Sequence, residues 1–253
     1  MLRLPMLEDW QAVCAAVGRP TGVLLAPVLL RQGARVRRTT PVLPEAAGDR
    51  SGREGATGGQ APLRLLVVGE STAAGVGVEH QRDALPRQLA VELSRHCDRA
   101  VEWQVRARTG ATAGAAAREL LATATGAQDL VVVALGVNDT LRLRSRRHWR
   151  ERITLVLDVL QPQLAPAGQV LLAGVPDLAA FPALPRPLRT VLAWHARALD
   201  GELRRLAARR RGVLHAPAPA LTGAVFAADG FHPNADACAR WAQHLAGVAS
   251  VRG

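Results

Sequence analysis

Three short stretches of this 253-residue chain combine residue types that can carry out nucleophilic chemistry. They read Gly69-Glu70-Ser71-Thr72, Gly136-Val137-Asn138-Asp139 and Asp229-Gly230-Phe231-His232-Pro233. A serine, a histidine and a carboxylate can act as nucleophile, base and orienting acceptor, and an amide side chain can donate to an oxyanion. The residue types therefore suggest acyl transfer, provided that the fold brings the three stretches together.

Ser71 alone among the five serines stands where a nucleophile would be expected. It follows the apolar run LLVV at 65–68, at a strand-to-helix turn where a hydroxyl can project from the edge of a sheet. The other four lie in a Gly-rich segment, in helical patterns or in the tail. Taken alone, however, the stretch fits a helix N-cap better than a catalytic serine.

Phosphate-binding and hydrolase-elbow motifs do not account for the glycines around Ser71. The chain has no lysine for a P-loop, and its glycines lack the G-x-G-x-x-G spacing of dinucleotide sites. The elbow G-x-S-x-G fails because Ala73 stands at the second glycine position.

Asp229 and His232 are three residues apart in a turn, close enough for the carboxylate to orient the imidazole. The alternative is a capping aspartate beside a surface histidine; the other six histidines lack such a partner in a turn. Asn138, at the end of the most apolar predicted strand, suits an oxyanion donor and equally suits a turn or a cap. Gly110, after another strand, can supply a backbone N–H, but alone it is only a turn glycine.

The elements that must position these residues alternate between strand and helix. Buried strands are predicted at 65–68, 101–105, 130–135, 170–173 and 213–214, and helical faces recur between and after them, as at Trp149, Ile153, Val156 and Leu160. This alternation predicts an α/β fold with a parallel sheet of about five strands between two helical layers. Ligands then bind beyond the carboxyl ends of the strands, where the three stretches lie.

Taken together, in this order, the motifs resemble the SGNH, or GDSL, hydrolase family. GES at 69–71, TGAT at 109–112, GVND at 136–139 and DGFHP at 229–233 follow that family's four blocks, over about residues 65–248. The resemblance implies a flavodoxin-like α/β/α sandwich and an esterase without metal or cofactor. It also implies that Ser71 is the nucleophile and one oxyanion donor, Gly110 and Asn138 further donors, His232 the base and Asp229 its partner. Two departures, Glu70 for the family's Asp and Thr72 for its Leu, put the loop geometry in question.

Composition argues against several other classes of protein. All 32 basic residues are arginine, the net charge is +11, and aromatic residues make up 3% of the chain. With few platforms for base stacking and no nucleic-acid-binding motif, we expect no nucleic acid partner. The three cysteines, Cys14, Cys97 and Cys238, have neither disulfide-framework nor zinc-site spacing.

The N-terminal quarter lies outside the resemblance. We predict an apolar and basic appendage over 1–43, a flexible linker over 44–62 and a hydrolase domain over 63–253. The run at 21–30 is too short to span a bilayer and lacks the features of a secretory signal. It therefore predicts a helix packed on the domain or, as the alternative, peripheral contact with the inner face of the membrane from a cytoplasmic protein.

The predicted reaction is hydrolysis of a carboxylic or thio ester, of a lipid or a small acyl compound. The proline-rich stretch 175–188 fits an apolar wall for an acyl chain or a surface connection. The arginines at 142–152 fit attraction of an anionic ester or a solvated helix face. Alternatives are a carbohydrate O-acetylesterase or acyltransferase on the same fold, and a non-catalytic, basic surface-binding protein.

Overall fold

A six-stranded sheet forms the centre of the protein in a computed structural model that describes residues 19–55, 60–121, 126–220 and 225–249. The strand order is β1-β3-β2-β4-β5-β6. Strands β2 to β6 are parallel, and β1 pairs antiparallel with β3. The bounds are β1 Ser51–Glu54, β2 Leu63–Gly69, β3 Val101–Ala107, β4 Gln128–Ala134, β5 Leu164–Ala173 and β6 Val213–Ala216.

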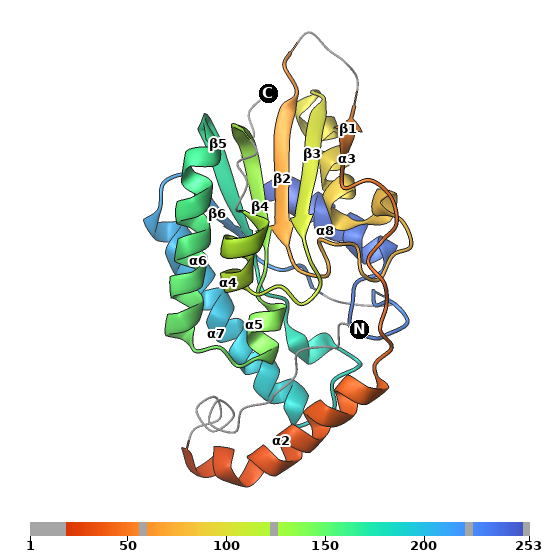
Figure 1. Cartoon of the computed structure of the whole chain (residues 1–253), viewed down its shortest axis with the longest axis vertical. Helices are drawn as coiled ribbons and strands as arrows, with labels where there is room; N and C mark the ends of the chain where they lie inside the picture. Colours follow the sequence, from red (N-terminus) through yellow and green to blue (C-terminus); the bar gives the residue numbers. More distant parts are fainter. Residues whose placement is uncertain (1–18, 56–59, 122–125, 221–224, 250–253) are drawn as a thin grey trace.

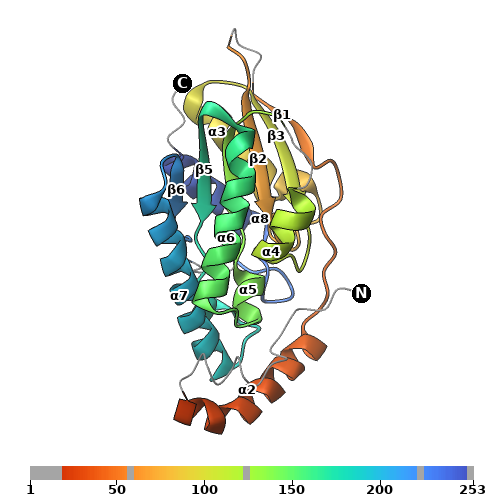
Figure 2. The same ribbon diagram turned by 60° about the vertical axis from the view of Figure 1, so that its left-hand side comes forward.

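Helices cover both faces of the sheet, as Figures 1 and 2 show, so the predicted three-layer α/β/α fold is confirmed. Helices α3 (Leu85–Cys97) and α8 (Ala235–Val248) pack on one face. On the other lie the short α4 (Ala113–Ala115), α6 (Arg146–Leu160) and α7 (Leu188–Arg209). Alternate residues of β2 serve the two layers: Leu65 and Val67 face α3 and α8, and Leu66 and Val68 face the other core. The remaining elements are α5 (Val137–Leu141), η1 (Gln81–Asp83), η2 (Ala116–Leu120), η3 (Gln161–Gln163) and η4 (Leu178–Ala180).

All five strands expected from the apolar runs are present, and β1 is an addition. Residues 51–54 lie in the range predicted as a flexible linker, yet they pair with Val101–Gln104 of β3. Three of the four are exposed and the fourth is half-buried, so no apolar pattern marks them. An edge strand of this kind is held by backbone hydrogen bonds, which the sequence does not reveal.

Helix α2 (Arg19–Thr39) lies across the carboxyl ends of the parallel strands, at the foot of the molecule in Figures 1 and 2. Its side chains Ala26, Leu29 and Val36 are buried in the core shared with α6 and α7. Gln32 ties it to the start of α7: its Nε2 donates to the Arg186 carbonyl at 2.6 Å, and its Oε1 accepts from Leu188 N–H at 3.0 Å. The predicted packing of this helix on the domain is confirmed. Among the described residues, no helix is long and apolar enough to cross a membrane.

Three parallel strands end level with one another. Gly69, the last residue of β2, pairs with Ala107 at the end of β3 and with Ala134 at the end of β4. The segments that follow these strands therefore leave the sheet at one edge, which brings the stretches containing Ser71, Gly110 and Asn138 together.

Candidate active site

Ser71, His232 and Asp229 form a continuous hydrogen-bonded relay. The Ser71 Oγ lies 2.9 Å from His232 Nε2, and His232 Nδ1 lies 2.6 Å from Asp229 Oδ2. All three side chains belong to buried residues, with 5–9% of their surface exposed. If Nδ1 carries the proton toward Asp229, then Nε2 has a lone pair available for the Ser71 hydroxyl. The geometry is that of a nucleophile, its base and the base's orienting group.

The turn after β2 holds Ser71 in place. A Cβ on Gly69 would come within 2.5 Å of the Ala73 Cβ and 2.8 Å of the Ala134 carbonyl, so only glycine fits there. Beyond it, the Ser71 carbonyl accepts from Val76 N–H at 2.9 Å and closes the turn. The nucleophile position is therefore set by close packing of backbone at the edge of the sheet.

Asp229 organises the turn that carries His232. Its Oδ1 accepts from the backbone N–H groups of Phe231 at 2.9 Å and His232 at 3.0 Å, and Gly230 takes a left-handed φ of 63°. Burial alone would raise the pKa of Asp229, but hydrogen bonds from the His232 side chain and from both backbone groups hold it below its ordinary value. The carboxylate is therefore ionised and able to stabilise an imidazolium.

Asn138 lies beside Ser71 and Gly110 in one pocket, but the structure gives its amide two acceptors already. Its Nδ2 donates to Glu70 Oε2 and, at 3.1 Å, to the Ala111 carbonyl. An amide nitrogen has two N–H groups, so donation to an oxyanion requires exchange of one of these bonds. The predicted donor is thus near the nucleophile, held by partners that the sequence did not suggest.

Glu70 forms the other half of this arrangement. Besides the Asn138 side chain, its carboxylate accepts from the backbone N–H groups of Val137 at 2.8 Å and Asn138 at 2.9 Å. Burial raises the pKa of Glu70 to about 7, although these hydrogen bonds favour the ionised form and nearby Asp139 adds to the rise. Burial also raises the pKa of Asp139 to about 6, against a hydrogen bond from Ala113 N–H at 2.9 Å.

Gly110 follows β3 in a turn with φ 78°, a conformation that favours glycine. Thr109, directly before it, is bound through its N–H and its hydroxyl to the Glu45 carboxylate, each at 2.7 Å. Gly110 lines the same pocket as Ser71 and His232. The structure therefore brings all five predicted site residues to one edge of the sheet.

Two pockets adjoin the nucleophile, and Ser71 and His232 line both of them. The first, which we call the phenylalanine pocket, is lined mainly by apolar side chains, as small-molecule sites usually are. Its wall includes all three phenylalanines of the chain, in edge-to-face contact with ring centroids 5.1–5.2 Å apart. Pro176 and Phe181 of the proline-rich stretch line it, which agrees with the predicted apolar wall. It is lined by Glu70, Ser71, Thr72, Ala134, Leu135, Val137, Ala173, Gly174, Pro176, Phe181, Phe226, Phe231, His232, Pro233 and Trp241.

The second pocket, which we call the strap pocket, is walled partly by residues that precede β1. Its lining is Arg37, Thr40, Pro41, Val42, Leu43, Ser71, Val76, Thr109, Gly110, Val137, Asn138, Phe231 and His232. Sequence reasoning missed the contribution of residues 37–43, because nothing in their spacing indicates that they fold back over the site. An isolated Glu45 and the three dispersed phenylalanines gave equally little local signal.

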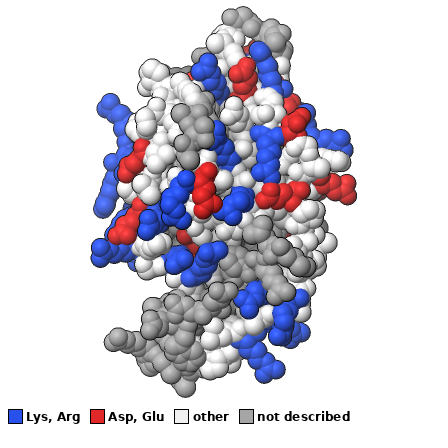
Figure 3. All heavy atoms as spheres, viewed as in Figure 1, with Lys and Arg blue, Asp and Glu red and all other residues white. Residues whose placement is uncertain are grey.

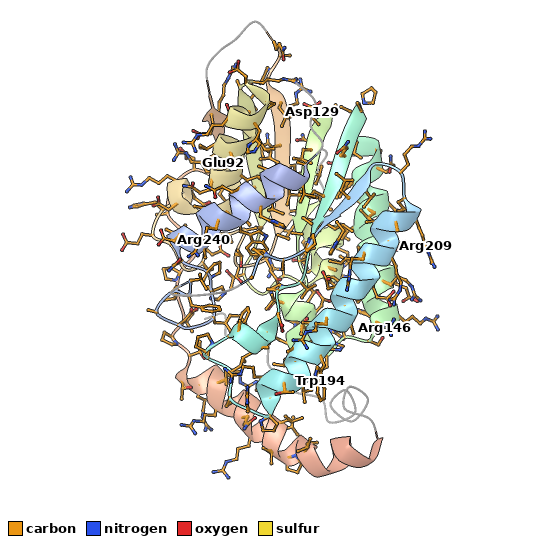
Figure 4. The ribbon with its side chains drawn as sticks, turned by 180° about the vertical axis from the view of Figure 1, so that it is seen from behind. Glu92, Asp129, Arg146, Trp194, Arg209 and Arg240 are labelled. Carbon is orange, nitrogen blue, oxygen red and sulfur yellow. The ribbon has the colours of Figure 1, made fainter. Side chains whose placement is uncertain are left out.

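The arginines at 142–152 line neither pocket. Arg146 and Arg150 bind the buried carboxylate of Glu202, together with Arg205 of α7. Figure 4 shows Arg146 and Arg209 on the outer flank of the molecule, away from the sheet edge. The side chains of Arg146 and Arg150 thus belong to an exposed helix face, and the attraction of an anionic ester by the arginines at 142–152 stays a prediction.

A second His–Asp pair lies elsewhere in the fold. His215 Nε2 is 2.9 Å from Asp200 Oδ1, which also accepts from Val175 N–H at 3.1 Å. Within the described residues, this pair makes no hydrogen bond to a serine hydroxyl. The same part of the chain contains no group of three side chains that could hold a metal ion.

Comparison with known proteins agrees with this architecture. Residues 67–240 match the GDSL-like Lipase/Acylhydrolase family, so the chain belongs to that family of hydrolases. Similar solved structures include an extracellular lipase from Streptomyces rimosus, 18% identical, with a TM-score of 0.53 over 74% of this chain and 100% of that one. The lipase Lip_vut3 from a goat rumen metagenome is 13% identical, with a TM-score of 0.55 over 74% and 99%. The structure of TesA is 23% identical, with a TM-score of 0.54 over 73% and 97%. At these identities the likeness concerns the fold, and no match was found among curated proteins.

Proposed function

We propose that this protein is a serine esterase that cleaves carboxylic or thio esters through an acyl-enzyme on Ser71. The observation that carries the proposal is the relay in which Ser71 Oγ, His232 and Asp229 are joined by contacts of 2.9 and 2.6 Å. The family and the lipases among the similar solved structures support ester hydrolysis as the reaction class.

The reaction follows from the positions of these atoms. The Ser71 Oγ attacks the carbonyl carbon while its proton passes to His232 Nε2, forming a tetrahedral oxyanion. The oxyanion collapses, the bond to the leaving oxygen or sulfur breaks, and the imidazolium returns its proton to that atom. Water then attacks the acyl-enzyme with His232 again as base, which releases the acid and restores the Ser71 hydroxyl.

The phenylalanine pocket supports an apolar acyl group as the substrate portion. Its aromatic wall begins at Ser71 and is continuous with the core around Phe181 and Phe226. Burial of each methylene in such a wall stabilises binding by about 0.8 kcal/mol. We therefore expect kcat/KM to rise with acyl chain length until the pocket is filled, whereas a carbohydrate O-acetylesterase would prefer acetyl.

The test is a panel of p-nitrophenyl esters from acetyl to decanoyl, assayed with the wild type and with Ser71→Ala, His232→Ala and His215→Ala. The first two variants should lose more than 1,000-fold in kcat, because each removes a group that forms or breaks bonds. His215→Ala removes a comparable, partly buried His–Asp pair and should retain at least a tenth of the activity. Substantial turnover by Ser71→Ala, or no labelling of Ser71 by a fluorophosphonate, would refute the assignment.

A further inference from the structure

Residues 40–50 connect α2 to β1, and we call them the N-terminal strap. This segment packs along the hydrolase fold. In Figure 1 it rises from α2 at the foot of the molecule to β1 at the edge of the sheet. Ala47 N–H donates to the Glu79 carbonyl at 2.9 Å, and Gln81 N–H donates to the Ala47 carbonyl at 2.8 Å. The strap is thus bonded to the turn that follows Ser71, although it lies outside the residues that match the family.

The strap meets the candidate active site at two places. Residues 40–43 line the strap pocket together with Ser71 and His232. Glu45, two residues further on, reaches the turn after β3, where its Oε1 accepts both the N–H and the hydroxyl of Thr109 at 2.7 Å. Thr109 immediately precedes Gly110, so this carboxylate controls the backbone next to a residue of the oxyanion region.

Glu45 is itself held in position by Arg50. The Arg50 guanidinium binds Glu45 Oε2 and also donates to the carbonyl of Ala107, the last residue of β3, at 2.9 Å. The carboxylate is therefore bound at one oxygen by the strap and at the other by the turn that it organises. Burial alone would raise the pKa of Glu45, but the bonds from Thr109 and Arg50 outweigh burial and lower it, so the carboxylate is ionised.

We propose that Glu45 is a positioning residue for ester hydrolysis, and that it holds the Thr109–Gly110 turn so that the Gly110 N–H can stabilise the oxyanion. This inference rests on the proposed function, because it assigns a purpose to the turn in that reaction. Gly110 in its left-handed conformation has no side chain to anchor it, and the neighbouring Thr109 supplies the anchor. Donors aimed at an oxyanion act only in the transition state, so loosening the turn lowers kcat and leaves KM nearly unchanged.

The chain offers a matched control in Glu54. This carboxylate also lies in the N-terminal region and also pairs with an arginine, since Arg87 Nε donates to it at 2.6 Å. It joins β1 to α3 and does not contact the turn after β3. Replacement of Glu54 therefore removes a comparable ion pair without touching the site.

The experiment compares Glu45→Ala, Glu45→Gln and Glu54→Ala in the full chain on the ester that the wild type cleaves best. Glu45→Ala should lower kcat about 10- to 100-fold with KM within threefold of wild type. Glu45→Gln keeps an oxygen that can accept from Thr109 and should recover most of the loss, while Glu54→Ala should keep wild-type kcat. A fall in Glu45→Ala that is matched by Glu54→Ala, or that appears in KM alone, would overturn the proposal.

Hydrogen–deuterium exchange separates this inference from the proposed function. Exchange in a peptide covering 105–115 should be faster in Glu45→Ala than in the wild type and unchanged in Glu54→Ala, whether or not the ester is turned over. Unchanged exchange in Glu45→Ala overturns the positioning role. If the wild type cleaves none of the esters but exchange is still faster in Glu45→Ala, the reaction proposed for the site is refuted, and the contact between Glu45 and the Thr109–Gly110 turn is not.

Discussion

Glu70, which stands where the family has Asp, is the residue in which the site departs most clearly from the family pattern. Its side chain is one methylene longer, and its carboxylate accepts three hydrogen bonds. The longer side chain reaches two backbone N–H groups at the start of α5 and the Asn138 amide at once. The three donors stabilise the ionised form of this carboxylate, whereas burial disfavours the ionised form. The raised pKa of about 7 indicates that burial has the larger effect.

This raised pKa predicts how stability depends on pH. Between about pH 4.5, the ordinary value for Glu70 in an unfolded chain, and about pH 7, the native protein holds one more proton than the unfolded chain. The free energy of unfolding should therefore fall as pH rises through this window, by about 3 kcal/mol from Glu70. Asp139, with a pKa of about 6, should add a smaller fall in the same direction.

Urea unfolding at pH 5 and pH 8 measures this effect in the wild type and in Glu70→Gln. The variant cannot titrate at position 70, so its stability should change less between the two values, with only the contribution of Asp139 and the remaining groups left. Equal pH dependence in the two proteins would show that Glu70 does not titrate in this range.

At the scale of elements, the site depends on how α5, α6 and α7 pack at the end of β4. Trp149 of α6 is fully buried, and its indole Nε1 donates to the Leu199 carbonyl of α7 at 3.1 Å. A Cβ on Gly136, just before α5, would come within 3.3 Å of the same ring. The tryptophan thus links two helices to the turn that carries Asn138.

Trp149→Ala should lower the free energy of unfolding by about 3–5 kcal/mol, because it leaves a large cavity and removes the hydrogen bond to Leu199. Trp194 on α7, labelled in Figure 4, is the matched control: it is 59% exposed, and its replacement by alanine should change stability by less than about 0.5 kcal/mol. Both values come from urea denaturation. Similar losses for the two variants would contradict the packing described for α6 and α7.

At the scale of the whole molecule, charge is spread over the surface rather than collected in the site. Figure 3 shows arginines over much of one face, including the lower end where α2 lies, with fewer carboxylates between them. On α2, Arg31, Arg35 and Arg38 are exposed, and Val28 is 45% exposed. This combination of basic and apolar side chains supports the prediction of peripheral contact with an anionic membrane surface.

Co-sedimentation with vesicles tests that contact. The protein should bind vesicles containing anionic phospholipid and not neutral ones. Replacement of Arg31, Arg35 and Arg38 by glutamine should weaken binding about 100-fold, at about 1 kcal/mol for each arginine. A control that replaces Arg95, Arg147 and Arg209 removes the same charge from other surfaces and should weaken binding less. Equal effects would mean that net charge, and not α2, determines the attraction.

The strands and the site motifs could be predicted from the sequence because both depend on residues close together in the chain. Apolar runs such as 65–68 and 130–135 became β2 and β4, since a strand buried on both faces needs an unbroken apolar segment. Ser71, Gly110, Asn138, Asp229 and His232 could be named because their four short motifs, in this order along the chain, resemble those of the family. Parallel topology then carries these motifs to one edge of the sheet, where the structure has them together.

Tertiary structure alone decided what surrounds those residues. The three phenylalanines meet in one wall, Glu45 reaches Thr109 across 64 positions, and β1 pairs with β3 without an apolar pattern of its own. Contacts of this kind depend on the path of the chain through space, and they leave no periodicity or spacing in the sequence by which to find them. The family's motifs supply the reactive side chains at the edge of the sheet. The N-terminal segment that folds over this edge forms part of the pocket around them.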